Sequence, residues 1–359
     1  MTGNKGEWSE LYAFFKLAAD GKLYAADANT NKIESIYYDI LKLIRSQKDG
    51  KWSYVRNGNI KVVFESTGEE IAVIPISEFK EKAELLLASI KAAKDKNGSF
   101  EVPEIENFAN KIKCNTPKAK SIDKEDITLV IHDVKTGSTP TLGFSIKSQL
   151  GSPSTLLNAS GATNFLYELK GRKMTVEEIE TFDGLKGYKR KFEFLDTLGV
   201  SLKFYKIENK IFRSNLMLID TFMPDIVAYM IEMYFRKKAV KVEDLTKLCA
   251  VKNICNVETN DNYVYYSFKI KELLTGVALG MMPNTPWKGN YAATGGYIIV
   301  RDDGDVLCYH IYNRNEFREY LFNNTKFDTP GSTKHNYGYI EEKDGKQVLK
   351  LNFQIRFIK

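Results

Sequence analysis

The stretch LVIHDVKTGSTPTLGFSIKS, from Leu129 to Ser148, contains an acid and a base that could act together. Two apolar runs flank a turn-rich insert, a pattern that predicts a β-hairpin. The first run ends on Asp133, and the second holds Lys147 where an apolar residue would pack better. A carboxylate beside an ammonium in a central sheet is costly to bury unless it serves a purpose. The pair is therefore a candidate for chemistry.

Alternation along the second run determines which side chains accompany Lys147. Ser145 and Lys147 point to the same face of a strand, roughly 7 Å apart, whereas Phe144 and Ile146 point to the other face, into apolar packing. If the two runs pair as a hairpin, we expect Asp133, at the end of one strand, to meet Lys147 on its neighbour.

These residue types suit phosphodiester hydrolysis by the PD-(D/E)xK nuclease plan. In that plan an aspartate on one strand and an acid on the next bind a divalent metal. A lysine two residues after the second acid neutralises the scissile phosphate and helps to activate water. Hard oxygen ligands of this kind suit Mg2+, which polarises the phosphoryl oxygen. We predict that Asp133 is a metal ligand and that Lys147 is catalytic.

The second acid of the plan is missing, because Ser145 stands in its place in the triplet Ser-Ile-Lys. Serine is a poor metal ligand, so another carboxylate should supply the charge. We expect Glu10, in the segment KGEWSE, to be this second metal ligand, and we retain Ser145 as a site residue. Glu7 is an alternative, since it lies three residues away on roughly the same helix face.

Two plainer interpretations of these residues stay open. An aspartate and a lysine at this spacing often occur by chance, as a turn-capping acid and an exposed base. In addition, Asp133 and Lys135 form an acid-x-Lys triplet of their own, whose upstream partner would be Asp126. We rank that triplet lower because both of its acids lie on one short run.

Hydrophobic spacing predicts the elements that position these residues. Leu11, Phe14, Phe15 and Ala18 recur at three- and four-residue spacing, which predicts an amphipathic helix that ends at Gly21. Further helices are expected over 76–93, over 101–114, over 163–169 with Thr163 as its cap, and over 211–238 with a break near Pro224. Strands are expected over 51–66 with a turn at Asn57-Gly58, over 201–208, and over most of the chain from Tyr263, with hairpins at Asp303-Gly304 and Asp344-Gly345.

This mixture of helices and strands predicts an α+β fold with an α/β nuclease core. We expect a mixed central β-sheet flanked by helices, of PD-(D/E)xK type, and a strand-rich C-terminal region. Residues 1–200 should form the catalytic core, and residues 201–359 a helical, then strand-rich, region for DNA recognition. One continuous domain is the alternative.

The composition excludes several classes of protein. The 359 residues are 43% hydrophobic, enough for a sizeable core, and no long uncharged apolar stretch predicts a membrane span. The N-terminal residues lack a secretory signal, so we expect a cytoplasmic protein. Four scattered cysteines predict neither a disulfide framework nor a zinc site. The net charge of +6 permits a polyanionic partner without demanding one.

Several blocks of the chain resemble HpaII-type restriction endonucleases. They are TGNKGEWSELY, IHDVKTG followed by GFSIKSQLGSPSTLLNASGATNF, MMPNTPWKGNYAATGGYIIV, GDVLCYHIYNRNEF and FDTPGSTKHNYG, in order from Thr2 to about Gly338. The resemblance implies a type II restriction endonuclease that needs Mg2+ and cuts double-stranded DNA within CCGG. It also implies that Asp133 and Lys147 hold the core roles.

Reading CCGG in the major groove requires donors to guanine and acceptors for cytosine. We expect them in the loop that follows Lys147 and in a Gly/Ser/Thr loop near the C-terminus. The candidate DNA contacts are Gln149, Ser152, Thr155, Asn158, Thr163 and Asn164 in the first loop, and Ser332, Thr333, Lys334 and His335 in the second. The alternatives are a solvated loop with a helix cap and a plain hairpin connection.

Other functions and assemblies stay open. A sequence-specific DNA-binding protein without nuclease activity would explain Ser145 as a decayed site. A nuclease of the His-Asn-His type would use CYHIYNRN, although the chain has three widely spaced histidines. A palindromic target favours a homodimer, because a two-fold partner matches a two-fold site.

Overall fold

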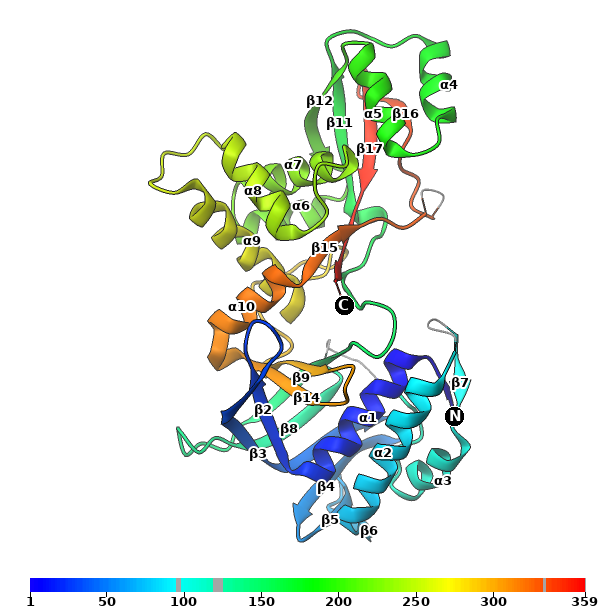
Figure 1. The fold of residues 1–359 in the computed structure, drawn as a ribbon, viewed down its shortest axis with the longest axis vertical. Helices are drawn as coiled ribbons and strands as arrows, with labels where there is room; N and C mark the ends of the chain where they lie inside the picture. The colour runs from blue at the N-terminus through cyan, green and yellow to red at the C-terminus, as the bar shows by residue number, and fades with distance from the viewer. Residues whose placement is uncertain (95–97, 119–124, 332–333, 359) are drawn as a thin grey trace. The chain divides into compact units, whose positions relative to one another are not determined.

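The structure, a computed structural model, describes residues 1–94, 98–118, 125–331 and 334–358. They form two compact units (Figure 1). Unit 1 consists of Met1–Ser154 and Tyr291–Tyr320, and unit 2 consists of Thr155–Asn290 and Leu321–Ile358. The chain leaves unit 1 after residue 154 and returns to it at residue 291, so these boundaries replace the expected one at residue 200.

A nine-stranded mixed sheet forms the centre of unit 1. Its strand order is β2-β14-β13-β9-β8-β3-β4-β5-β6, and β2 also pairs with β3. Strand β9 lies between β8, which is antiparallel to it, and β13, which is parallel to it. The strands are β2 (Lys22–Ala26), β3 (Lys32–Gln47), β4 (Gly50–Asn57), β5 (Asn59–Phe64), β6 (Glu69–Ile74), β8 (Ile127–His132), β9 (Thr141–Ser148), β13 (Gly296–Val300) and β14 (Val306–His310).

Three helices of unit 1 pack against one another through aromatic side chains. The helices of unit 1 are α1 (Lys5–Asp20), α2 (Ile76–Ala92) and α3 (Pro103–Lys111), and α10 (Arg314–Asn323) follows the short 3-10 helix η2 (Ile311–Asn313). Figure 1 shows α1 and α2 side by side, and α1 also contacts β9 and β3. Phe15 of α1, Phe79 of α2 and Phe108 of α3 meet pairwise with ring centroids 5.0 to 5.9 Å apart. A small sheet of β1 (Thr2–Gly3) and β7 (Phe100–Glu101) lies beside them.

Local signals explain where α1 begins and ends. The Asn4 side chain accepts a hydrogen bond from the Glu7 N–H, and the Glu7 carboxylate accepts one from the Asn4 N–H, so the two residues form a capping box. Gly21 ends the helix with a φ of 67°, a left-handed conformation that glycine adopts without strain. The predicted helix and its end at Gly21 are therefore confirmed.

Unit 2 contains two smaller sheets and most of the helices. Its sheets have the strand orders β12-β11-β17-β16 and β10-β18-β15. The strands are β10 (Thr155–Leu157), β11 (Asn164–Lys170), β12 (Ser201–Ile207), β15 (Thr325–Asp328), β16 (Ile340–Lys343), β17 (Lys346–Asn352) and β18 (Gln354–Phe357). The helices are α4 (Val176–Gly184), α5 (Tyr188–Thr197), α6 (Lys210–Ile219), α7 (Met223–Phe235), α8 (Val242–Lys252) and α9 (Asn262–Leu279), with the 3-10 helix η1 (Gly161–Thr163).

Two predicted elements are wrong. The helix expected after Thr163 is strand β11, which pairs with β12 on one side and β17 on the other, so the two ladders override local helix propensity. The strand expected from Tyr263 is the start of α9, whose first turn is capped by the Asp261 side chain. Its buried Tyr266, Ile270 and Leu273 recur at helical spacing, which the aromatic and β-branched composition hid.

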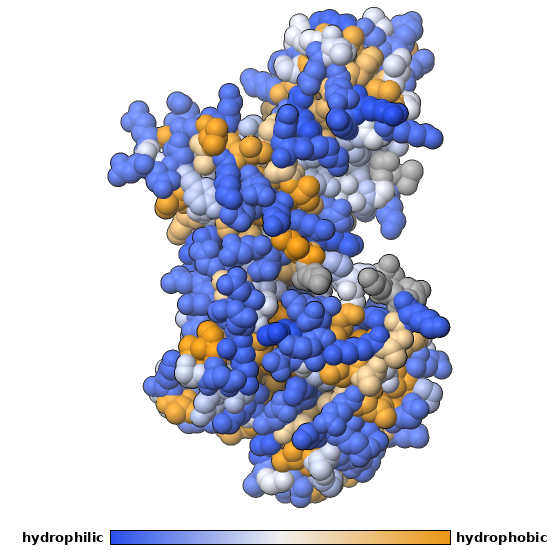
Figure 2. All heavy atoms as spheres, viewed as in Figure 1, coloured by the Kyte–Doolittle hydropathy of each residue, from blue (hydrophilic) through white to orange (hydrophobic). Residues whose placement is uncertain are grey.

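The expected α+β class and three predicted hairpins agree with the structure. Helices accompany sheets whose strand pairs are mostly antiparallel, which is consistent with an α+β fold, and the predicted hairpins β4–β5, β13–β14 and β16–β17 form. Within the described residues, none of the helices has the length and apolar character of a membrane span. Figure 2 shows hydrophilic residues over most of the visible face of both units.

Candidate active site

The β8–β9 hairpin keeps Asp133 away from Lys147. Its register pairs Ile127 with Phe144, and Asp133 bridges to Ser138 beside the turn. Lys147 lies nine residues beyond Ser138, which is about 30 Å along an extended strand. The expectation that Asp133 meets Lys147 is therefore wrong, because the hairpin closes immediately after Asp133.

Asp133 instead has a structural setting at the hairpin turn. It is buried, and it accepts hydrogen bonds from the Lys135 N–H at 2.9 Å and from the Thr136 hydroxyl at 3.0 Å. Burial opposes its ionisation, but these hydrogen bonds lower the pKa of Asp133 below its usual value. The side chain thus closes the turn, which is the plainer interpretation of this residue.

The same register places Asp126 opposite Ser145. Asp126 Oδ2 accepts a hydrogen bond from the Ile146 N–H at 2.7 Å and one from the Ser145 hydroxyl at 3.2 Å. Asp126 therefore occupies the position on the first strand that we had given to Asp133. The sequence names Asp126 only as the partner of the lower-ranked triplet, although the register set by the turn at Gly137 places it opposite Ser145.

Lys147 lies near two carboxylates. As predicted, Phe144 and Ile146 point into the apolar core, whereas Lys147 points to the other face, where its Nζ lies 5.5 Å from the ring centroid of Tyr297. Burial lowers the pKa of Lys147, and the charges of Asp126 and Glu10 oppose that fall. Both acids are therefore close enough to stabilise its charged form.

Glu10 comes to the site from α1, as expected. The preceding residue, Ser9, is buried and accepts a hydrogen bond from the Ser148 hydroxyl at 2.8 Å, which ties α1 to β9 next to Lys147. Burial raises the pKa of Glu10 to about 8, and the negative charge of Asp126 adds to the rise. The Oε2 atom of Glu10 is buried and has no hydrogen-bond partner among the described residues.

Four residues thus come together from α1, β9 and the residue before β8. We call them the active-site cluster: Glu10, Asp126, Ser145 and Lys147. Three of the four residues that we predict to be catalytic belong to this cluster, whereas Asp133 lies at the hairpin turn and Asp126 is bonded to Ser145.

Two further cations surround the cluster and were missed by sequence reasoning. Arg45 on β3 is 2% exposed, and its Nη2 donates hydrogen bonds to the carbonyls of Thr116, at 3.0 Å, and Pro117. Arg45 and Lys118 both oppose the rise in the pKa of Glu10. Nothing in their local sequence marks them, because their proximity depends on how α1 packs over β3.

Glu7, the acid in the first turn of α1, caps the helix. Glu7 belongs to the capping box with Asn4, in which its carboxylate accepts the Asn4 N–H at 3.0 Å. This capping role explains why an acid stands one turn before Glu10. We therefore assign the charge next to Lys147 to Glu10 and not to Glu7.

The donor set suits a hard divalent cation that takes only part of its ligands from protein. Within the described residues no group of three or more His, Cys, Asp or Glu side chains is arranged to hold a metal. Two carboxylates that repel each other, with Glu10 Oε2 buried and unpaired, are a favourable setting for such an ion. Mg2+ is usually held by one or two carboxylates, with water and substrate phosphate completing its shell.

The predicted DNA contacts are divided between the two units. Gln149 and Ser152 follow β9 in unit 1 and are partly buried, and the other described candidates belong to unit 2. Of these, Asn158 and Lys334 are exposed, and Thr155 and His335 are partly buried. Ser332 and Thr333 lie outside the described residues.

Thr163 and Asn164 are unsuited to DNA contact as the chain is folded. Both are buried, and Asn352 Nδ2 donates hydrogen bonds to Thr163 Oγ1 at 3.1 Å and to Asn164 Oδ1 at 2.7 Å. Asn164 Nδ2 in turn donates to the His335 carbonyl at 3.2 Å. The two side chains hold η1, β11 and β17 together, so their expected role in base reading is corrected to a structural one.

The histidine of CYHIYNRN does not form a nuclease centre. His310 is fully buried, its Nδ1 accepts a hydrogen bond from the Tyr312 N–H at 3.1 Å, and its ring packs on Tyr38. Burial lowers its pKa to about 4, so it is neutral at pH 7. These contacts describe a core histidine.

Comparisons with known proteins agree with the resemblance seen in the sequence. Residues 4–357 match the family described as HpaII restriction endonuclease. The chain is 46% identical over 358 residues to the type II restriction enzyme HpaII of Haemophilus parainfluenzae, and the match covers 100% of this chain and 99% of that protein. No solved structure matches the chain.

The metal assignment to Glu10 can be tested without measuring activity. We expect Mg2+ to raise the melting temperature of the wild type and of Glu7→Gln, because an ion that binds only the folded state stabilises it. Glutamine keeps the capping geometry at position 7. Glu10→Gln should lose most of the Mg2+-dependent rise in a thermal-shift titration. An equal rise in Glu10→Gln would remove Glu10 from the metal site.

The raised pKa of Glu10 predicts how stability depends on pH without metal. The folded state keeps a proton on Glu10 that the unfolded state, with a pKa near 4.5, releases. This contribution is fully present below pH 4.5 and is lost as the pH rises towards 8. Denaturant titrations of the metal-free protein should show a fall on the order of a few kcal/mol between pH 5 and 8. Glu10→Gln should flatten that slope, and an identical slope would contradict the assignment.

Proposed function

This chain belongs to the HpaII restriction endonuclease family, and we propose that its active-site cluster is where it cuts DNA. It is a type II restriction endonuclease, a site-specific deoxyribonuclease. One observation carries the proposal: Asp126 and Lys147 lie on the same face of the β8–β9 hairpin, and α1 brings Glu10 beside them. These are the charges that phosphodiester hydrolysis requires.

The cluster supports a nuclease core of the PD-(D/E)xK type. Asp126 immediately precedes β8, and Lys147 stands two residues after Ser145, which lies opposite Asp126 on β9. Ser145 takes the position of the second acid, and its hydroxyl holds the Asp126 carboxylate in place. We propose that Glu10 supplies the missing charge from the helix.

Mg2+ is the proposed cofactor, held by Asp126 and Glu10. When bound, it would polarise the scissile phosphate and ease the deprotonation of the attacking water. The unpaired Oε2 atom of Glu10 supports this assignment, since a buried carboxylate oxygen without a donor is costly unless a cation compensates it. Ile146 supports it too, because its N–H fixes the orientation of Asp126.

Lys147 is the proposed partner of the scissile phosphate. Its burial favours the neutral amine, whereas the two neighbouring carboxylates favour the ammonium. Such a balance suits a group that holds a phosphate oxygen by charge and exchanges a proton with water. The Tyr297 ring, which the Lys147 ammonium approaches, restricts where that charge can lie.

We propose double-stranded DNA containing CCGG as the substrate, as the resemblance implies. Exposed Asn158 and Lys334, together with partly buried Gln149, Ser152, Thr155 and His335, are the candidates for contact with it. An amide can bond a base edge, whereas a lysine more often contacts phosphate. Because CCGG reads the same on both strands, a homodimer remains the expected assembly. The cytoplasmic location expected from the sequence also stays a prediction.

Plasmid cleavage tests this proposal against the alternative of DNA binding without chemistry. We expect Mg2+ to support cutting into discrete fragments whose ends map to CCGG, and EDTA to stop it. A plasmid that stays intact but shifts in a gel would support the binding protein instead. Fragments that map to another sequence would keep the nuclease and overturn the target.

Matched variants separate Asp126 from Asp133. Asp126→Asn and Lys147→Met should lower the cleavage rate by about 10²-fold or more, since each removes a charge that acts on the reacting phosphate. Asp133→Ala should cut at nearly the wild-type rate but lose about 1–3 kcal/mol of stability, because the Lys135 N–H and the Thr136 hydroxyl lose their acceptor. Single-turnover cleavage and denaturant titration measure the two effects. Inactive Asp133→Ala with active Asp126→Asn would reverse the assignment.

A further inference from the structure

A cavity of about 490 Å3 lies in unit 1 at the start of α1. The β3–β4 turn contributes Gln47 and Lys48, and the residues after α3 contribute Thr116, Pro117 and Lys118. Thr2 and Glu7, from the start of the chain, complete the lining. Its volume is in the range of ligand-binding cavities.

The cavity adjoins the place where DNA would be cut. Glu7 in its lining is one helical turn from Glu10, and residues three apart on a helix are surface neighbours. Burial is the largest influence on the pKa values of Glu10 and Lys147, but the charge of Lys118 opposes the rise of the first and adds to the fall of the second. Lys118 is therefore within electrostatic reach of both residues.

Hydrogen bonds from Arg45 fix the backbone just before Lys118. Buried Arg45 donates hydrogen bonds to the carbonyls of Thr116 and Pro117, and the Thr116 hydroxyl donates one to the Lys118 carbonyl at 2.6 Å. A buried guanidinium is costly to desolvate, so its bonds to this segment are a built feature of the fold. The Lys118 side chain is exposed, and its carbonyl is held by the Thr116 hydroxyl.

The charges of the lining favour an anion. Two lysines, Lys48 and Lys118, stand against one carboxylate, Glu7, whose Oε2 already accepts the Asn4 N–H at 3.0 Å. An anion entering the cavity would therefore meet two exposed ammonium groups.

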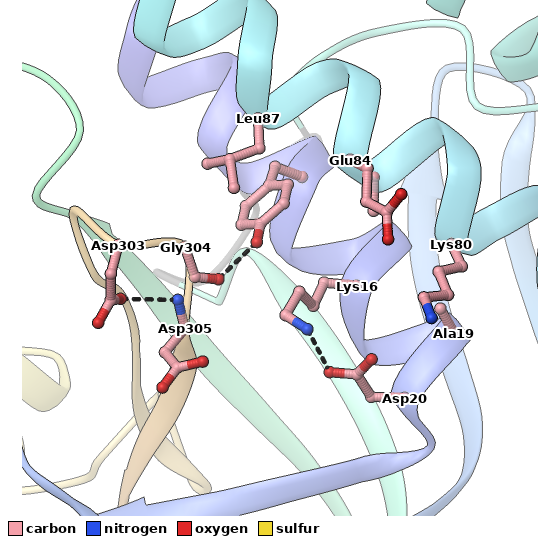
Figure 3. A pocket seen from close by; sticks show the side chains of 11 residues that line it. Lys16, Ala19, Asp20, Lys80, Glu84, Leu87, Asp303, Gly304 and Asp305 are labelled. Carbon is pink, nitrogen blue, oxygen red and sulfur yellow. Dashed lines mark hydrogen bonds and ion pairs between the residues drawn. The ribbon is translucent and has the colours of Figure 1, made fainter.

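In a second cavity of unit 1, of about 240 Å3, acids outnumber lysines (Figure 3). Lys16 and Lys80 lie there among four acids, and Lys16 is paired with Asp20 at 2.7 Å. Its four acids are Asp20, Glu84, Asp303 and Asp305. The lysines of this acidic cavity serve as matched controls, because they belong to the same unit.

We propose that Lys48 and Lys118 bind a second backbone phosphate of the DNA strand being cut, next to the scissile phosphate. The inference rests on the proposed function, because it takes the active-site cluster as the place of cleavage. Each strand of duplex DNA carries a phosphate about every 3.4 Å along the helix axis, so a neighbouring phosphate is always near a scissile one. The ligand class is a phosphodiester, and the two lysines contact it by charge, without reading sequence.

The test measures binding separately from cutting. Lys48→Gln, Lys118→Gln and the double variant are compared with wild type and with Lys80→Gln, which alters the acidic cavity. Binding to a duplex oligonucleotide containing CCGG is measured in EDTA over a series of salt concentrations. Each lost phosphate contact should make the negative slope of log K against log salt shallower by about 0.9, and it should weaken binding at low salt.

The results of this binding test can be told apart from a failure of the proposed nuclease function. A reduced slope in both single variants, additive in the double variant and absent in Lys80→Gln, supports the second phosphate site. Unchanged slopes, or an equal loss in Lys80→Gln, overturn it. Failure of the wild type to cut CCGG with Mg2+ would instead overturn the proposed function, and it would be seen in a different assay. Lys118→Arg should keep the wild-type slope, because it keeps the positive charge.

Discussion

The register between β8 and β9 is the constraint on which the rest of the site depends. A shift of one residue would turn Asp126 away from Ser145, since neighbouring side chains on a strand face opposite ways. The turn at Gly137, whose φ is 68°, sets that register close to the hairpin end, and Asp133 holds the turn through the Lys135 N–H. The aspartate that we expected to perform chemistry thus stabilises the turn of the hairpin, and the aspartate proposed to perform it lies at the other end of β8.

The charges that act on Glu10 of α1 come from the sheet of unit 1 and from the residues after α3. Glu10 would be difficult to ionise if it faced only Asp126, because burial and a like charge both raise its pKa. Arg45, Lys118 and Lys147 oppose that rise from three different segments. The site therefore combines repulsion between two acids, which favours a cation, with positive charges at its edge, which favour a phosphate. Both features suit a reaction on a metal-bound polyanion.

Sequence reasoning found much of this arrangement, and its errors have definite causes. The helix α1, the hairpin and the facing of Lys147 follow from local patterns of three to twenty residues. From the sequence, Asp126 ranks below Asp133 because the pairing is argued from the strand ends and not from the turn. Arg45 could not be found, because only the packing of α1 brings it near Glu10. Thr163 was given to a helix and to DNA because the ladders on both sides of β11 and the buried Asn352 come from distant parts of the chain.

The return of the chain to unit 1 at residue 291 has a consequence for the order of folding during synthesis. A nascent chain of 290 residues already contains all four members of the cluster but lacks β13, the parallel neighbour of β9. Until Tyr297 emerges from the ribosome, one edge of the strand bearing Lys147 stays unpaired, and the lysine lacks the ring beside it. Completion of unit 1 therefore waits until residues 155–290 of unit 2 have been translated. A prematurely released fragment would carry the four side chains of the cluster without β13 and β14, two of the nine strands of the sheet in unit 1.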